Sequence, residues 1–156
     1  MRQPIDIASL ASWMTRQSAV VLFLGLGPDE ILHAQNLSVT QFSFGQSNPT
    51  YHIRYSSSPQ SLVLRKKPSQ VVHKSAHAID REYFVLEYIL AYNQKVLSEL
   101  DNDESASAQG QNTQPSSDPL STVKDYCIPI PQPIIYCSDI SILNTEFYLM
   151  EYVGGR

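Results

Sequence analysis

Three β-type segments follow one another in the first half of the chain, with only short polar connections between them. They run over Ser38–Phe44, Thr50–Tyr55 and Ser61–Arg65, and each is rich in β-branched or aromatic side chains. A glycine-containing turn separates the first two, and Ser56–Pro59 separates the last two. Because a parallel crossover needs about a dozen residues or more, connections this short predict antiparallel hairpins.

A long amphipathic helix is predicted after these strands, over about residues 76–97. Its apolar residues recur at spacings of four, three and four, and they are Ile79, Tyr83, Leu86 and Leu90. This spacing places them on one side of a helix. We therefore expect a single long helix that packs its apolar stripe on the sheet.

A second helix is predicted near the amino terminus, over residues 6–17. Asp6 is a suitable N-cap residue, because its carboxylate can accept a hydrogen bond from the backbone of the first turn. The apolar face of this helix consists of Leu10, Trp13 and Met14. We expect residues 1–36 to form a helical extension that precedes the strands.

The last part of the chain returns to β-type sequence. A proline-rich stretch, residues 128–133, leads into a predicted strand over Ile134–Cys137. Asn144 marks a turn, and Glu146–Tyr152 is the final predicted strand. Together with the first three strands this predicts an α+β domain over residues 37–156, with an antiparallel sheet of about five strands and one long helix.

Residues 98–123 interrupt this domain with a segment of Ser, Asp, Asn, Gln and Glu that has almost nothing to bury. Such a composition is typical of disordered chain, so we expect a disordered polar insertion. A long connection of this kind is compatible with a compact domain when both its ends lie at the surface, since the entropy of loop closure grows slowly with length.

The charge and hydropathy of the chain argue against several classes of function. The formal net charge of −4 at pH 7 leaves no basic surface of the kind that binds nucleic acid. The longest apolar run, Ala19–Leu26, is too short to span a bilayer. No secretory cleavage site or peroxisomal ending is evident. We expect a cytoplasmic protein, with the mitochondrion or the peroxisome as alternatives for a longer protein.

The two cysteines, Cys127 and Cys137, lack the close pairing and the neighbouring histidines of a zinc site. A disulfide between them stays open as an alternative. We favour two small, half-buried apolar side chains.

Four short features could bind a ligand, and each also has an ordinary structural explanation. The glycine turn, residues 44–51, could hold phosphate oxygens on its backbone N–H groups, or it could be a simple hairpin turn. Arg65 could contact phosphate, or it could be a solvated strand end. Glu82 could pair with Arg65, or it could point into solvent. Residues 147–155 could present backbone groups to an adenine edge, or they could be a core strand followed by a turn.

The order of these features is that of the N-terminal lobe of protein-kinase-like proteins. The sequence resembles the aminoglycoside phosphotransferase family, and most of all its branch associated with acyl-CoA dehydrogenases. Residues 44–51, 64–68, 75–83 and 147–153 carry this resemblance, which extends from about Asp6 to Arg156 except for the polar insertion. It implies a protein-kinase-like N-lobe, ATP and magnesium as cofactors, and transfer of the γ-phosphoryl group to a hydroxyl of a small molecule, a hydroxyacyl-CoA more than an antibiotic.

The resemblance also implies roles for individual residues. Arg65 would stand where the family places its phosphate-contacting lysine, with Glu82 as its helix partner. An arginine there departs from the general kinase pattern, but it keeps the charge and adds a fork of donors. The residues implied to bind ATP are Gly45, Gln46, Ser47 and Asn48 in the phosphate loop, Arg65, Glu82, and Met150, Glu151 and Val153 around the hinge that would hold adenine.

The catalytic part of such an enzyme is absent from the sequence. In the family, the catalytic aspartate lies in a His-Gly-Asp-type loop beyond the hinge, and a later aspartate binds magnesium. No histidine here is followed by Gly-Asp, so no catalytic residue and no metal ligand is predicted. We expect part of a phosphotransferase that lacks the larger lobe. The alternative is a non-catalytic module that binds a nucleotide or a protein partner.

Overall fold

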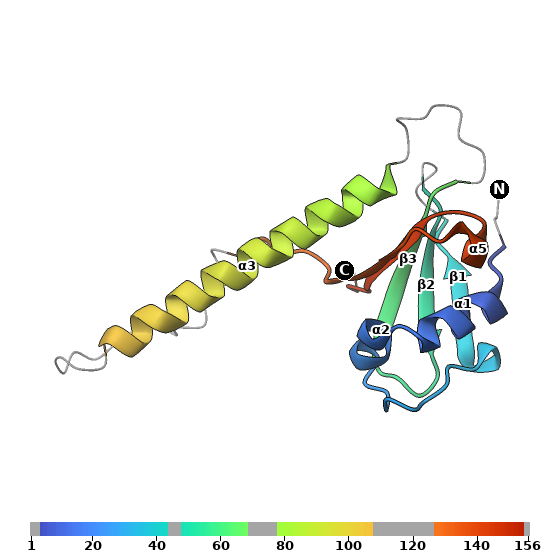
Figure 1. The fold of residues 1–156 in the computed structure, drawn as a ribbon, viewed down its shortest axis with the longest axis horizontal. Helices are drawn as coiled ribbons and strands as arrows, with labels where there is room; N and C mark the ends of the chain where they lie inside the picture. Colours follow the sequence, from blue (N-terminus) through green and yellow to red (C-terminus); the bar gives the residue numbers. More distant parts are fainter. Residues whose placement is uncertain (1–3, 44–47, 69–77, 108–126, 155–156) are drawn as a thin grey trace. The chain divides into compact units, whose positions relative to one another are not determined.

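The computed structural model describes residues 4–43, 48–68, 78–107 and 127–154. They form an α+β fold whose antiparallel sheet has five strands in the order β1-β2-β3-β5-β4 (Figure 1), which confirms the predicted fold class. The strands are β1 (Leu37–Gln41), β2 (Thr50–Tyr55), β3 (Ser61–Lys66), β4 (Pro133–Cys137) and β5 (Phe147–Glu151). The helices are α1 (Ile7–Thr15), α2 (Ser18–Phe23), the 3-10 helix η1 (Ala34–Asn36), α3 (Ile79–Ser107) and α5 (Ile140–Leu143).

The chain divides into two compact units, which are described separately here. Residues 1–84 and 131–156 form the sheet unit, which contains all five strands and the first turn of α3. Residues 85–130 form the second unit. Within the second unit, Asn93 Nδ2 donates to Ile128 O at 2.8 Å and Asn93 Oδ1 accepts from Ile128 N at 2.9 Å. These two bonds fix the chain after residue 127 against α3.

The strand pairing follows the antiparallel arrangement that the short connections predict. β3 then pairs with β5, so that Leu64 lies opposite Tyr51 on one side and Leu149 on the other. β1 ends at Gln41 instead of Phe44, although Phe42 N still donates to Thr50 O at 2.9 Å. Phe44 lies outside the described residues.

One face of the sheet carries the apolar core. Alternation along β2 and β3 places Tyr51, Ile53, Leu62 and Leu64 on this face, and all four are buried. Helices α1, α2 and α5 cover the same face (Figure 1), and their apolar side chains join one buried cluster with the strands. Trp13 of α1, for example, contacts Phe147 edge-on at a ring distance of 4.9 Å. The functional side chains must therefore lie on the other face.

The amino-terminal helix begins as predicted and ends earlier. Asp6 caps α1, and its carboxylate accepts a hydrogen bond from Ser9 N at 3.0 Å. The helix ends at Thr15, and Gln17 is extended before a second helix begins at Ser18. In the sequence, the start of α2 is visible only as part of the apolar run Ala19–Leu26. A helix of six residues is too short to show a clear periodicity.

The long helix extends further than predicted. α3 runs to Ser107, so the first ten residues of the segment 98–123, predicted as disordered, are helical. Residues 98–107 contain Leu, Glu and Ala and no Gly or Pro, which explains why nothing stops the helix near Leu97. Lys95 and Glu99 also form an ion pair at 3.7 Å with the favourable spacing of four. Residues 76–77 and 108–123 lie outside the described residues.

The short helix α5 and a tight turn at the predicted Asn144 connect the last two strands. This residue adopts a left-handed conformation with φ of 59° and ends the short helix α5. Asp139 caps the start of that helix by accepting from Ser141 N at 2.9 Å. α5 was not predicted, because four residues give no periodic signal.

Neither cysteine forms a disulfide, and Cys137 is buried while Cys127 is half-buried, in agreement with the favoured interpretation. None of the helices in the described part of the chain is long and apolar enough to cross a membrane.

Candidate functional site

Four of the six predicted site residues that the structure describes, Asn48, Arg65, Glu82 and Met150, lie on or reach the face of the sheet opposite the core. Strand alternation places Val63 and Arg65 of β3 on this face, with Met150 and Tyr148 of β5 directly opposite them. His52 of β2 lies on the other side of Val63. The first turn of α3 brings Glu82 to the same face, as its contact with Arg65 shows.

Arg65 and Glu82 form the ion pair that the sequence analysis predicted. Arg65 Nη2 donates to Glu82 Oε1 at 3.3 Å, and Nε lies 2.8 Å from Oε2. The Nε contact is an ionic one, because Nε has no hydrogen-bond partner among the described residues. The two side chains are 33% and 37% exposed, so the pair borders solvent and could be reached by a ligand.

Two further side chains donate to the same carboxylate. Asn48 Nδ2 lies 3.0 Å from Glu82 Oε1, and the hydroxyl of Tyr148 lies 3.3 Å from Oε2. Burial raises the pKa of Tyr148 to about 12, so its hydroxyl remains a donor at neutral pH. Glu82 is thus surrounded by donors from the turn before β2, from β3 and from β5. The sequence analysis assigned no role to Tyr148.

The predicted phosphate loop is described only at its end. Gly45, Gln46 and Ser47 lie outside the described residues. Asn48 is 3% exposed, and its backbone carbonyl accepts from Thr50 Oγ1 at 3.0 Å. The loop therefore enters β2 through a residue that is buried and directed at Glu82.

An aromatic patch, defined by Phe42, His52 and Tyr152, lies on the same face near the end of β5. The rings of His52 and Tyr152 stack at 4.1 Å, and Phe42 lies 6.5 Å from Tyr152 and nearly parallel to it. Phe42 and Tyr152 are each 37% exposed. The patch offers a flat surface on which a planar ring could stack. The sequence analysis missed it, although alternation along β2 does place His52 on the face opposite the core.

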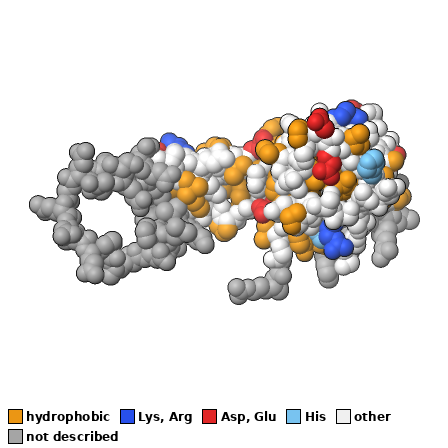
Figure 2. All heavy atoms as spheres, turned by 90° about the horizontal axis from the view of Figure 1, so that it is seen from below, with side chains coloured by type: hydrophobic (Ala, Val, Ile, Leu, Met, Phe, Trp, Pro, Cys, Tyr) orange, Lys and Arg blue, Asp and Glu red, His pale blue; other side chains and the backbone are white. Residues whose placement is uncertain are grey.

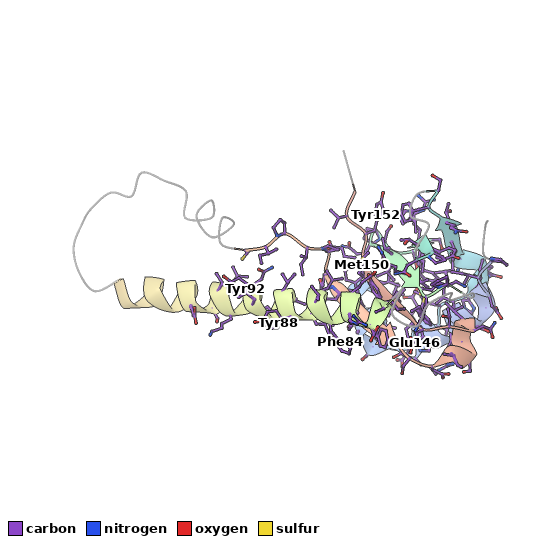
Figure 3. All side chains as sticks on the ribbon, turned by 90° about the horizontal axis from the view of Figure 1, so that it is seen from above. Phe84, Tyr88, Tyr92, Glu146, Met150 and Tyr152 are labelled. Atoms are coloured by element: carbon purple, nitrogen blue, oxygen red, sulfur yellow. The ribbon has the colours of Figure 1, made fainter. Side chains whose placement is uncertain are left out.

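The predicted hinge residues lie where β5 ends. Glu151 N donates to Gln132 O at 2.8 Å, and Tyr152 N donates to Ser61 O at 3.0 Å. Val153 is the first residue beyond these bonds, and its N–H takes part in no backbone hydrogen bond with the described residues. Val153 is also 60% exposed, so its N–H is the first one after the end of β5 that a ligand could reach. Figure 3 labels Met150 and Tyr152 toward this end of β5 and Glu146 just before its start.

The charges around the site are few. Lys67 and Glu146 form a second ion pair at 3.3 Å where β3 ends and β5 begins. Among the described residues, no three His, Cys, Asp or Glu side chains are grouped closely enough to hold a metal ion. On the surface seen in Figure 2, Lys and Arg side chains lie apart from one another, without a continuous basic patch.

The chain is similar to a segment of the acyl-CoA dehydrogenase family members 10 and 11. It is 35% identical over 151 residues to family member 11 of Rattus norvegicus, which is 97% of this chain and 14% of that protein. It is 37% identical over 120 residues to family member 11 of Gallus gallus, which is 77% of this chain and 11% of that protein. The match to family member 10 of Mus musculus is 36% over 129 residues, 83% of this chain and 8% of that protein.

These matches agree with the part of the predicted resemblance that concerns acyl-CoA dehydrogenase-associated proteins. The chain spans about a tenth of the length of these relatives, namely 8% to 14%. No protein-family profile matches the sequence, and no solved structure matches it.

Proposed function

We propose that this chain is the ATP-binding lobe of a small-molecule phosphotransferase of the aminoglycoside phosphotransferase type, with a protein-kinase-like fold. The Arg65–Glu82 ion pair carries the proposal. A cation at the end of a central strand, paired with an acid in the first turn of the following long helix, is the arrangement with which kinase-like proteins present a charge to nucleotide phosphates.

The residues present on this face fit a nucleotide. The side chain of Arg65 is partly exposed, so donors that do not face Glu82 are available to phosphate oxygens. In the proposal, Gly45, Gln46 and Ser47 would contribute backbone N–H groups. The N–H of Val153, which has no backbone partner among the described residues, would meet the edge of adenine.

The apolar walls of the same site would hold the ring of adenine. Met150 lies beside Val63 on the sheet, and both would contact the ring of adenine. Glu151 lies two residues before Val153, and its carbonyl would offer an acceptor beside the N–H of Val153. The partly exposed rings of Phe42 and Tyr152 would limit the site on its outer side. Apolar walls with a few directed polar groups are typical of small-molecule sites.

The chemical step would depend on residues outside this chain. Magnesium would supply charge stabilisation when bound, and its ligands and the catalytic aspartate would lie in a further lobe of a longer protein. We propose a hydroxyl group of a small molecule as the phosphoryl acceptor. The names of the relatives refer to acyl-CoA dehydrogenases, which favours a hydroxyacyl-CoA as acceptor.

Thermal unfolding with and without magnesium-ATP tests the proposal. A ligand that binds only the folded chain raises the midpoint in proportion to the logarithm of its concentration above Kd. We expect such a rise for the wild-type chain and a clearly smaller one in Arg65→Ala at the same nucleotide concentration. Arg16→Ala is the matched control, because Arg16 contacts Ser12 on α1, which covers the opposite face. An equal rise in Arg65→Ala, or none in the wild-type chain, would contradict the proposal.

A further inference from the structure

Glu82 receives hydrogen bonds from two buried side chains that nucleotide contact does not explain. Asn48 is 3% exposed and Tyr148 is 2% exposed, whereas the side chains of Arg65 and Glu82 are partly open to solvent. Asn48 Nδ2 and the hydroxyl of Tyr148 are both directed at the carboxylate. Neither group is placed at the surface where a phosphate would arrive.

The donors are divided evenly between the two carboxylate oxygens. Oε1 receives Asn48 Nδ2 and Arg65 Nη2, and Oε2 receives the hydroxyl of Tyr148 and faces Arg65 Nε. Each oxygen is therefore near one neutral side-chain donor and one nitrogen of the guanidinium. A guanidinium pairs best with a carboxylate that lies in its own plane.

We infer that Asn48 and Tyr148 are positioning residues that fix the plane of the Glu82 carboxylate and, through it, the direction of the Arg65 guanidinium. This inference deepens the proposed function and rests on it for its consequence at the nucleotide. Asn48 lies just before β2 and contacts the same carboxylate oxygen as Arg65 Nη2, so its side chain and the direction of Arg65 are coupled through Glu82. Asn48 then acts on a nucleotide through Arg65 and does not itself touch phosphate.

The first test requires no nucleotide. The Nε–Hε resonance of Arg65 in a ¹H–¹⁵N spectrum reports the environment of the guanidinium, and Arg65→Lys assigns it by removing it. We expect Asn48→Ala and Tyr148→Phe to shift or broaden this resonance, because each removes one donor from the carboxylate. Tyr148→Phe keeps the buried ring and therefore keeps the packing of β5.

Two control variants separate positioning from general loosening. Tyr55→Phe removes a buried hydroxyl from the core face of the same sheet, where it donates to Ile31 O at 3.4 Å. Thr50→Val removes the hydrogen bond to Asn48 O but leaves both donors to Glu82 in place. Both controls should leave the Arg65 resonance unchanged. The inference is overturned if the resonance is unchanged in Asn48→Ala and Tyr148→Phe, or if the controls move it equally.

The second test is a double-mutant cycle on the affinity for magnesium-ATP. We expect Asn48→Ala to weaken binding about tenfold, which is roughly 1.4 kcal/mol. In an Arg65→Ala background the same change should weaken binding less than about twofold, since the two residues act in one network. Equal tenfold losses in both backgrounds would mean that Asn48 touches the nucleotide directly, which overturns its positioning role.

The two tests distinguish a failure of the proposed function from a failure of the positioning inference. An Arg65 resonance that responds to both variants, in a chain that does not bind magnesium-ATP, supports the positioning contacts and contradicts the proposed function. If the chain binds magnesium-ATP through Arg65, but the Arg65 resonance is unchanged in Asn48→Ala and Tyr148→Phe, the proposed function is supported and the inference is overturned.

Discussion

His52 has an imidazole nitrogen, Nε2, that is buried without a hydrogen-bond partner among the described residues. Its ring stacks on Tyr152 and lies near Phe42, and neither of these side chains carries a negative charge that would pair with a protonated imidazole. Burial, followed by the positive charge of Arg54, lowers the pKa of His52 in the folded chain. Protonation of His52 therefore favours the unfolded chain, in which the imidazole keeps its ordinary pKa.

Replacing His52 by Phe is expected to reduce the dependence of stability on pH. Between the lowered pKa and the ordinary value of about 6.5, the unfolded chain binds the proton and the folded chain does not. The free energy of unfolding of the wild-type chain should therefore fall as pH falls through 6.5. His52→Phe keeps an aromatic ring for stacking and removes this pH-dependent part of the stability. Urea unfolding from pH 7.5 to pH 5.5 measures the difference. Parallel curves for the two chains would contradict the prediction.

Part of the site could be predicted from single residues. Alternation along β3 and the position of Glu82 on α3 left the pair of Arg65 and Glu82 open beside solvent-facing alternatives. The resemblance to the aminoglycoside phosphotransferase family implied the pair, which the structure contains. The contact of Tyr148 with Glu82 depends on the register between β3 and β5, which joins segments separated by some eighty residues, and the contact of Asn48 joins positions that are 34 residues apart. Local patterns carry no information about that register.

At the scale of elements, the long or strongly alternating segments were predicted and the short ones were not. β2 has the predicted bounds, β3 and β4 differ by one residue at one end, and β5 is one residue shorter at each end. α2 and α5 were missed, because their sequences are too short for a periodic pattern and their helical form depends on packing against the core. Their apolar residues, such as Val20 and Leu143, complete the buried cluster.

The turn at Asn144 gives a test at this scale. A left-handed conformation is unfavourable for residues with a Cβ and is tolerated best by Gly and Asn. Asn144→Ala should therefore lower the free energy of unfolding by about 1 kcal/mol. Asn144→Gly should leave it nearly unchanged or slightly raised. Urea unfolding of the three chains measures the difference, and a loss in Asn144→Gly as large as in Asn144→Ala would show that the backbone conformation is not the cause.

At the scale of the whole molecule, every described residue of the buried cluster belongs to the sheet unit, and none comes from the described side chains of residues 85–99 and 127–130. Trp13 joins this core through its contact with Phe147 and is 7% exposed. Trp13→Ala should lower the free energy of unfolding by about 3–5 kcal/mol, through lost burial and the cavity left behind. Circular dichroism at increasing urea concentration measures the loss, and a loss below about 1 kcal/mol would mean that α1 contributes little to the core.

Replacing residues 108–126 by a short Gly-Ser linker should, in contrast, leave the stability of the sheet unit nearly unchanged. This segment is rich in Gln, Ser, Thr and Asp and has few apolar side chains to bury, and the entropy of closing a loop changes by less than about 1 kcal/mol when its length is roughly halved. Trp13 is the single tryptophan of the chain, so its fluorescence follows the core of the sheet unit directly during thermal unfolding. We expect the same midpoint within a few degrees and the same cooperativity in both chains. A lost or broadened transition would mean that residues 108–126 contribute to the core, and that the polar segment is more than an insertion between α3 and β4.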